Sequence, residues 1–214
     1  MDEDHHKMYR QIEVRLWKGG TEIEKPDFLV TEEPLEIRVN DLSAAVTMRT
    51  PGQDDALAVG FLATESILRS PADLYDVLRC GDPDDLHVGN DVNVYVDPER
   101  VPRDLNSRQR YANSSCGLCG KELVKDLFQI IQPLNNDKRI DIKKALDCLE
   151  TLPRHQPLRK QTRAAHAAIL YNSKFEQLVR AEDVGRHNAL DKAIGMAFLD
   201  RTLDQAALLI MSSR

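Results

Sequence analysis

Hydrophobic and polar residues alternate along several short segments in the first half of the chain. Residues 10–17 show this alternation, and Gly19-Gly20 follows as a turn. A period of two places successive side chains on opposite faces of a strand, so each segment predicts a strand. Asn40-Asp41 separates two such segments and predicts a hairpin. The other alternating segments are residues 35–39, 44–48 and 92–96.

Apolar residues at intervals of three and four predict helices elsewhere. One helix is expected from Asp54 to about Ser70, with Asp54 and Asp55 suited to capping and charging its start. Residues 50–54 are interpreted as the entry turn of this helix in preference to a ligand loop. Three further helices are predicted at residues 122–131, 141–152 and 188–199. Pro153 ends the second of these.

The second half of the chain mixes these helices with strands. Residues 166–171 and 174–179 are expected to pair around Asn172-Ser173, and residues 206–211 form an apolar strand of the buried type. Strands and helices in this order predict a layered α/β arrangement.

A polar segment is expected to separate two subdomains. Residues 97–110 contain two prolines and little apolar content, which is typical of a connection. We therefore predict an N-terminal α+β subdomain over residues 1–104 and a second domain over residues 105–214. The chain ends directly after an apolar strand, so the second domain is expected to be truncated at its C-terminus.

Charge and cysteine content narrow the function classes. The formal net charge is -6, from 29 Lys and Arg against 35 Asp and Glu, which disfavours non-specific nucleic-acid binding because that activity needs a large cationic surface. The sequence shows no membrane-spanning stretch, and residues 1–10 do not look like a signal peptide, so a cytoplasmic protein is expected. Four cysteines are too few for a disulfide scaffold.

Two of these cysteines lie in residues 114–120, which read Ser-Ser-Cys-Gly-Leu-Cys-Gly and precede a predicted helix. A helix start stabilises a thiolate through its free N–H groups and its dipole. Gly117 and Gly120 allow backbone amides to approach a sulfur atom or an anion. Cys116 and Cys119 are thus candidates for reactive thiols, and each lies close enough to relay a sulfur–sulfur bond to the other.

The spacing of this pair leaves three interpretations open: a reactive thiol pair, half of a zinc site, or structural burial. A zinc site needs further ligands, and His166 is the best remaining candidate. Cys148 lies on the apolar side of its predicted helix and is expected in the core, whereas Cys80 is interpreted as a bystander. Zinc deaminase chemistry lacks its acid/base, because no glutamate stands two positions after His166.

A second cluster of polar residues spans 181–192, at a predicted junction between strand and helix. Ligands bind at such junctions in α/β proteins because amides and side chains converge there. Arg186 is expected to pair with a phosphate group, and His187 to donate a proton or a hydrogen bond.

More ordinary roles are expected for the neighbours of Arg186 and His187. Asp183 or Asn188 is interpreted as a helix cap. Asp191 and Lys192 are interpreted as solvated charges.

Several segments taken together resemble the formate dehydrogenase accessory sulfurtransferase (FdhD) family. The joint occurrence of Ser-Ser-Cys-Gly-x-Cys-Gly and Glu-Asp-Val-Gly-Arg-His-Asn-Ala-x-Asp-Lys carries the resemblance, which runs from about Tyr9 to Arg214. The segments concerned are residues 32–40, 48–55, 59–62, 114–120 and 182–195.

This resemblance implies a fold and an activity. The fold class is α/β, with a cytidine deaminase-like three-layer α/β/α main domain and a smaller N-terminal α+β domain. Family members accept sulfur from a cysteine desulfurase as a persulfide. They pass it to the molybdenum cofactor of formate dehydrogenase, in its bis(molybdopterin guanine dinucleotide) form. Cys116 matches the persulfide cysteine and Cys119 its partner.

The resemblance also implies a homodimer, and we expect no resident metal. The predicted function is a sulfurtransferase, and the alternative is a zinc-binding or cofactor-chaperone module without sulfur transfer. A thioredoxin-like oxidoreductase fits poorly because no βαβ unit begins before the cysteine pair. The predicted cofactor-binding residues are Ser115, Gly117, Gly120, His166, Arg186 and His187.

Overall fold

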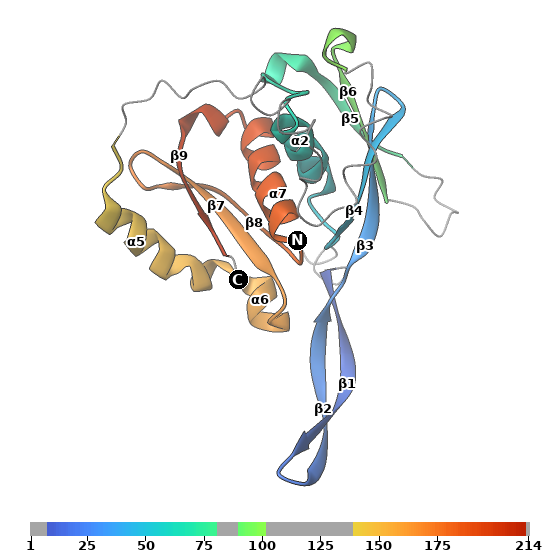
Figure 1. Ribbon diagram of the computed structural model, residues 1–214, viewed down its shortest axis with the longest axis vertical. Coiled ribbons are helices and arrows are strands. Elements are labelled where there is room, and N and C mark those ends of the chain that lie inside the picture. The colour runs from blue at the N-terminus through green and yellow to red at the C-terminus, as the bar shows by residue number, and fades with distance from the viewer. Residues whose placement is uncertain (1–7, 81–89, 102–138, 213–214) are drawn as a thin grey trace, which may run out of the picture.

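The computed structural model of the chain describes residues 8–80, 90–101 and 139–212. Two groups of strands and helices lie against each other, and a two-stranded ribbon extends away from them (Figure 1). The predicted helix at residues 122–131 lies outside the described residues. Short 3-10 helices join the larger elements at Pro71–Asp73, Pro98–Arg100, Leu152–His155 and Leu203–Gln205.

The first sheet has four strands in the order β4-β3-β6-β5. Asn40 and Asp41 form the turn between β3 and β4 with φ angles of 47° and 69°, which is the left-handed backbone that a two-residue hairpin turn requires. The predicted hairpin is confirmed, and β6 adds to it in parallel with β3. The strands are β3 (Glu33–Val39), β4 (Leu42–Arg49), β5 (Leu74–Cys80) and β6 (Asp91–Val96).

Helix α2 (Asp54–Thr64) covers one face of this sheet. The alternation in the sequence places every second side chain of β3 and β6 against the helix, and each such side chain is buried. Full burial of an aliphatic side chain of this size contributes about 1.5–3 kcal/mol. The buried strand residues are Leu35, Ile37, Val39, Val92, Val94 and Val96.

The ribbon consists of β1 (Tyr9–Lys18) and β2 (Thr21–Val30), paired along their whole length. It projects from the body as a long arm (Figure 1). At its base the rings of Tyr9 and Phe28 meet edge to face, and Asp27 forms an ion pair with Arg163. Towards the tip, Trp17 is 69% exposed.

The second sheet is antiparallel, with strands in the order β8-β7-β9. Successive residues of β7 point to opposite faces. Ala168 and Leu170 pack against α7, whereas Ala167 and Ile169 pack on the side of α5. The elements are α5 (Ile142–Thr151), α6 (Pro157–Thr162), β7 (His166–Asn172), β8 (Gln177–Asp183), α7 (Arg186–Leu199) and β9 (Ala206–Met211).

Helices α2 and α7 join the two groups through a very close crossing. A Cβ atom added at Gly60 would lie 1.8 Å from the carbonyl oxygen of Asp191, and one added at Gly195 would lie 1.8 Å from that of Ala56. Only glycine at both positions lets the two backbones approach this far. Phe198 of α7 also enters the core of the first sheet.

Several sequence expectations differ from the structure. The strand predicted at residues 174–179 is observed as β8, Gln177–Asp183. Strand β2 was not predicted, because its first half is exposed on both faces and shows no alternation. Strand β5 was also missed, since a bulge between Leu74 and Asp76 breaks its period. Helix α2 ends at Thr64 and not near Ser70; Leu68 is buried as its spacing suggested, but in a turn.

Candidate functional site

Polar residues from separate segments meet at one end of the second sheet. Strand β7 begins at His166, β8 ends at Asp183, and these two residues are directly paired. Ser212 follows the end of β9 and bonds to Ala167 at the same edge. Helix α7 starts at Arg186, three residues after Asp183. The sheet therefore brings His166 and the start of α7 to one place.

His166 is half-buried, and its Nδ1 atom lies 3.3 Å from the Ser212 hydroxyl. That hydroxyl accepts a hydrogen bond of 2.9 Å from the amide of Ala167, so its own proton is free to point at the imidazole ring. A serine hydroxyl both donates and accepts hydrogen bonds, so it suits either tautomer of the ring at Nδ1. Ser212 thus contacts the imidazole of His166 at this nitrogen atom.

Arg186 and His187 form the first turn of α7. Arg186 is half-buried and His187 is exposed, and neither side chain makes an ion pair or hydrogen bond with another described residue. The N-cap residue, Gly185, provides no side-chain cap, and no acidic residue lies in the first turn. A helix start of this kind favours negative charge through its dipole and its free N–H groups.

The Asp183 carboxylate is the centre of a buried network. Its Oδ1 atom accepts hydrogen bonds from the Gly185 amide at 2.8 Å and the Asn188 side-chain amide at 3.1 Å. Its Oδ2 atom accepts from the Thr50 amide at 3.0 Å and lies 2.8 Å from the Lys192 ammonium. Asp183 thus holds the turn into α7 and the entry loop of α2 together.

The expectation of a solvated Lys192 is wrong. Its side chain is 0% exposed, and the ammonium group donates to the Thr50 carbonyl at 2.7 Å besides its ion pair with Asp183. Lys192 lies four residues after Asn188, on the face of α7 that meets Thr50. The burial of Lys192 could not be predicted from the sequence, because a lysine in a charged segment of a helix is normally exposed.

Asp191 is half-buried and is also not a freely solvated charge. It accepts a hydrogen bond from the Thr64 hydroxyl at 3.2 Å. Burial raises the pKa of Asp191 to about 7; the Thr64 hydrogen bond opposes this shift and the nearby Glu65 adds to it.

A second buried ion pair, which was not predicted from the sequence, lies beside Thr50. Arg49 is 1% exposed, and its guanidinium group donates to both carboxylate oxygens of Asp54 at 2.8 and 3.0 Å. The side chain of Asp54 therefore binds Arg49 and does not cap α2, whose N-cap residue is Gln53. The predicted helix-entry turn at residues 50–54 is confirmed.

Glu182 has a structural role at the same edge of the sheet. Its carboxylate accepts hydrogen bonds from the amides of Leu158 and Arg159, the first turn of α6, at 2.9 and 3.0 Å. Burial raises the pKa of Glu182, and these two amides partly offset that rise. Glu182 and Asp183 thus fix two different helices.

Cys116 and Cys119, predicted to be reactive thiols, lie outside the described residues, as do Ser115, Gly117 and Gly120, so the predictions for all five stay predictions. Cys148 lies on the buried face of α5, as expected, and burial raises the pKa of its thiol. Within residues 8–80, 90–101 and 139–212, no three His, Cys, Asp or Glu side chains are grouped as a metal site would require. Over the same ranges, no helix has the length and apolar character needed to cross a membrane.

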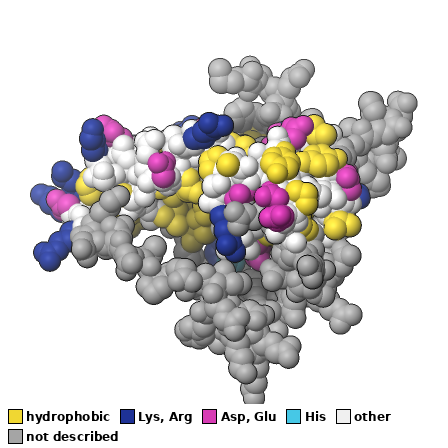
Figure 2. Space-filling view, turned by 90° about the horizontal axis from the view of Figure 1, so that it is seen from above, with side chains coloured by type: hydrophobic (Ala, Val, Ile, Leu, Met, Phe, Trp, Pro, Cys, Tyr) yellow, Lys and Arg dark blue, Asp and Glu magenta, His cyan; other side chains and the backbone are white. Residues whose placement is uncertain are grey.

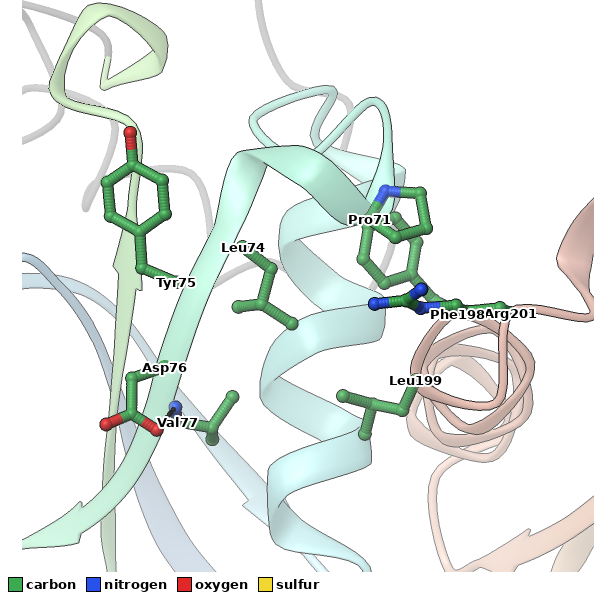
Figure 3. A pocket seen from close by; sticks show the side chains of 8 residues that line it. All are labelled: Pro71, Leu74, Tyr75, Asp76, Val77, Phe198, Leu199 and Arg201. Atoms are coloured by element: carbon green, nitrogen blue, oxygen red, sulfur yellow. Dashed lines mark hydrogen bonds between the residues drawn. The ribbon is translucent and has the colours of Figure 1, made fainter.

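A hollow of about 310 Å³ lies between β5 and the C-terminal end of α7 (Figure 3). Leu74, Val77 and Leu199 contribute to its lining. Since α7 has 14 residues and is therefore roughly 20 Å long, the hollow is well separated from Arg186. We do not assign the hollow to the candidate site.

Viewed from above, exposed hydrophobic side chains are interspersed with acidic ones over part of the surface (Figure 2).

Fold and site together define a mixed α/β protein whose polar residues gather where the strands of the second sheet end. A sequence profile of the FdhD/NarQ family matches residues 30–214. The chain belongs to the FdhD/NarQ family, which confirms the resemblance seen in the sequence.

Several relatives are similar over most of the chain. It is 40% identical over 178 residues to the sulfur carrier protein FdhD of Anaeromyxobacter dehalogenans strain 2CP-C, with 80% of this chain and 61% of that protein covered. The Streptomyces coelicolor protein of the same name is 38% identical over 209 residues, with 94% and 74% covered. The chain spans 61–64% of the length of three Anaeromyxobacter relatives.

The fold is also similar to a solved structure. A formate dehydrogenase accessory protein from Desulfotalea psychrophila matches with a TM-score of 0.70 at 22% identity, covering 96% of this chain and 74% of that one. The likeness concerns the fold, and it supports the prediction of a mixed α/β protein.

Proposed function

We propose that this protein is a sulfur carrier that receives sulfur from a cysteine desulfurase on Cys116 and delivers it to a molybdenum cofactor. Membership of the FdhD/NarQ family carries the proposal, since relatives at 38–40% identity are named sulfur carrier proteins. The Ser-Ser-Cys-Gly-Leu-Cys-Gly segment supplies the thiols that such a role requires.

The loading step is a thiolate exchange. The Cys116 thiolate attacks the outer sulfur of the desulfurase persulfide, and a new sulfur–sulfur bond forms on Cys116. The bond between the outer sulfur and the desulfurase cysteine breaks, and that cysteine leaves as a thiolate, so no external oxidant or reductant is needed. Cys119 is close enough in sequence to assist release: its thiolate would attack the inner sulfur of the Cys116 persulfide, a Cys116–Cys119 disulfide would form, and the outer sulfur would leave as hydrosulfide.

The acceptor in this proposal is the bis(molybdopterin guanine dinucleotide) form of the cofactor, bound as a substrate. Arg186 and His187 would contact its phosphate groups; the absence of a side-chain cap and of acidic residues in the first turn of α7 supports this assignment. His166 would offer Nε2 from the same edge of the sheet. Ser115, Gly117 and Gly120 would contribute from the cysteine segment.

The same proposal includes the domain organisation, the cellular compartment, the oligomeric state and the partner enzyme. The second domain, residues 105–214, would be cytidine deaminase-like with three layers, and residues 1–104 would form the smaller domain. The carrier would act in the cytoplasm as a homodimer and serve formate dehydrogenase. The packing of α5 and α7 against opposite sides of the second sheet supports the layered arrangement.

Intact mass measurement tests the proposal. After incubation with a cysteine desulfurase and cysteine, the protein is expected to gain one sulfur atom, about 32 Da, removable by a thiol reductant. Cys116→Ala should abolish the gain. Cys148→Ala is the matched control, because Cys148 is buried and burial raises the pKa of its thiol; the mass gain should persist in this variant.

Two results would contradict the proposal. One is a sulfur adduct that persists in Cys116→Ala. The other is stoichiometric zinc in the purified protein with Cys116 and Cys119 both protected from alkylation, which would favour the zinc-binding or cofactor-chaperone module.

A further inference from the structure

Every polar group of Thr50 is bound by a residue at the end of β8, in the turn that follows it, or in α7. Its amide donates to Asp183 at 3.0 Å, its carbonyl accepts from Lys192 at 2.7 Å, and its hydroxyl accepts from the Val184 amide at 3.1 Å. These partners lie more than 130 positions away in the sequence. The junction between β4 and α2 is therefore fixed to the junction between β8 and α7.

The ion pair in this contact is completely enclosed, with both side chains 0% exposed. Removing two charges from water is costly, and well-packed apolar residues often serve stability equally well in such places. What charges add is direction, because each hydrogen bond has a defined length and angle. The arrangement points to a role in orientation beyond a role in stability.

The oriented segment is the turn that leads into Arg186. The amides of Val184 and Gly185 are both bound, the first to Thr50 and the second to Asp183. One face of α7 is fixed as well, since Asn188 donates to the Met48 carbonyl at 2.7 Å and Lys192 binds one turn further on. With backbone and helix face both fixed, the direction of Arg186 from the helix start is set.

We propose that Asp183 and Lys192 are positioning residues for the delivery of sulfur to the acceptor, acting through Arg186. This inference rests on the proposed function. The pair holds the start of α7 so that Arg186 meets the phosphate groups of the acceptor. Loading of Cys116 by the desulfurase does not depend on it.

The test replaces the two charges together, as Asp183→Asn with Lys192→Met, because removing one alone would leave a buried charge without its partner. Loading is measured by intact mass. Delivery is measured by activation of formate dehydrogenase in cells that lack their own carrier, and affinity by titration with guanosine diphosphate. Loading should stay within about twofold of the unmodified protein, while delivery and affinity fall by about tenfold or more, as misplacement of a binding group predicts.

A matched control is the neighbouring buried pair, as Arg49→Met with Asp54→Asn. This pair flanks Thr50, and its hydrogen bonds and ion pairs within the described residues go to Glu33, Asn90 and to each other and not to β8 or α7. The control double variant should lower the free energy of unfolding, but it should not reduce delivery more than it reduces loading. If the first double variant fails to fold, Thr50→Val removes only the hydroxyl that binds Val184 and should give the same separation, more weakly.

Coupling to Arg186 provides the decisive measurement. Arg186→Gln alone should reduce delivery, and adding the Asp183 and Lys192 changes should reduce it little further, because the pair acts through that side chain. The inference is overturned if delivery is unchanged in the folded double variant, if loading and delivery fall together, or if the losses multiply. Failure of the unmodified protein to load sulfur would instead refute the proposed function.

Discussion

At the scale of single residues, each buried charge is stabilised by polar partners that take the place of water. The Lys192 ammonium pairs with the Asp183 carboxylate and donates to the Thr50 carbonyl, and the Arg49 guanidinium donates to both carboxylate oxygens of Asp54. Asp191 has one hydroxyl partner, Thr64; burial, together with the nearby Glu65, raises the pKa of its carboxyl group to about 7 although the Thr64 hydrogen bond opposes the shift.

Asp191 should make stability depend on pH. Its pKa is about 7 in the folded protein against 3.8 ordinarily, so between these values the folded state binds more protons than the unfolded state. The free energy of unfolding contributed by this group therefore falls as pH rises from about 4 to about 7. Asp191→Asn should flatten that part of the profile and stabilise the protein at pH 8, as measured by urea unfolding at pH 5 and pH 8. An unchanged profile would show that another group dominates.

Residue-scale predictions from sequence succeeded where burial follows from pattern. Cys148 lies in the core, as its apolar helix face indicated. The failure at Lys192 has a physical reason: a lysine in a charged motif is usually solvated, and the partner that buries it, Thr50, is 142 positions away. Arg186 and His166 were each predicted from the sequence as binding residues. Only the pairing of His166 with Asp183, three residues before Arg186, shows that the two lie at the same edge of the sheet.

At the scale of elements, periodic segments were predicted well and the others were not. Strands β1, β3, β4, β6 and β9 and helices α5 and α7 follow from their spacing. Strand β2 is stabilised by pairing with β1 and not by burial, and helix α6 is only six residues long, so neither has a clear period. The segment Glu33–Val39 acquires its parallel neighbour from a distant part of the chain.

The crossing of α2 and α7 gives an element-scale prediction. Gly195→Ala should lower the free energy of unfolding by about 3 kcal/mol, because its Cβ would meet the Ala56 carbonyl. This reverses the usual effect, since alanine in a helix normally gains about 1 kcal/mol over glycine.

Chemical denaturation measures the change at Gly195. Leu199→Ala, at a side chain of the same helix that is 41% exposed, is the control and should cost no more than about 1 kcal/mol. Equal losses in the two variants would mean that the helices do not require the close approach.

At the scale of the whole molecule, the arm formed by β1 and β2 contrasts with the packed body. A lone two-stranded ribbon is only marginally stable in water, and three or more strands or a packed face are normally needed. Here the base of the arm is anchored by Asp27 and Arg163, while Trp17 near the tip is exposed. Within the described residues, the arm is therefore held mainly by the pairing of its own two strands and by the contacts at its base.

Hydrogen exchange should reveal this difference. Amides of Tyr9–Lys18 and Thr21–Val30 are expected to exchange at least about tenfold faster than those of His166–Asn172, which is paired on both sides. Mass spectrometry of peptides from the two regions measures the rates, with the hairpin of β3 and β4 as a control of the same topology. Equal protection of arm and body would mean that a contact beyond the ones described stabilises the arm.

The enclosed Asp183–Lys192 pair has a consequence for how the molecule comes apart. Thr50 lies between β4 and α2, and the ion pair lies between β8 and α7, so separating these two junctions would break the hydrogen bonds of Thr50 to Asp183 and Lys192 together. Because neither group of elements can detach without losing these bonds, we expect both to unfold in a single cooperative thermal transition.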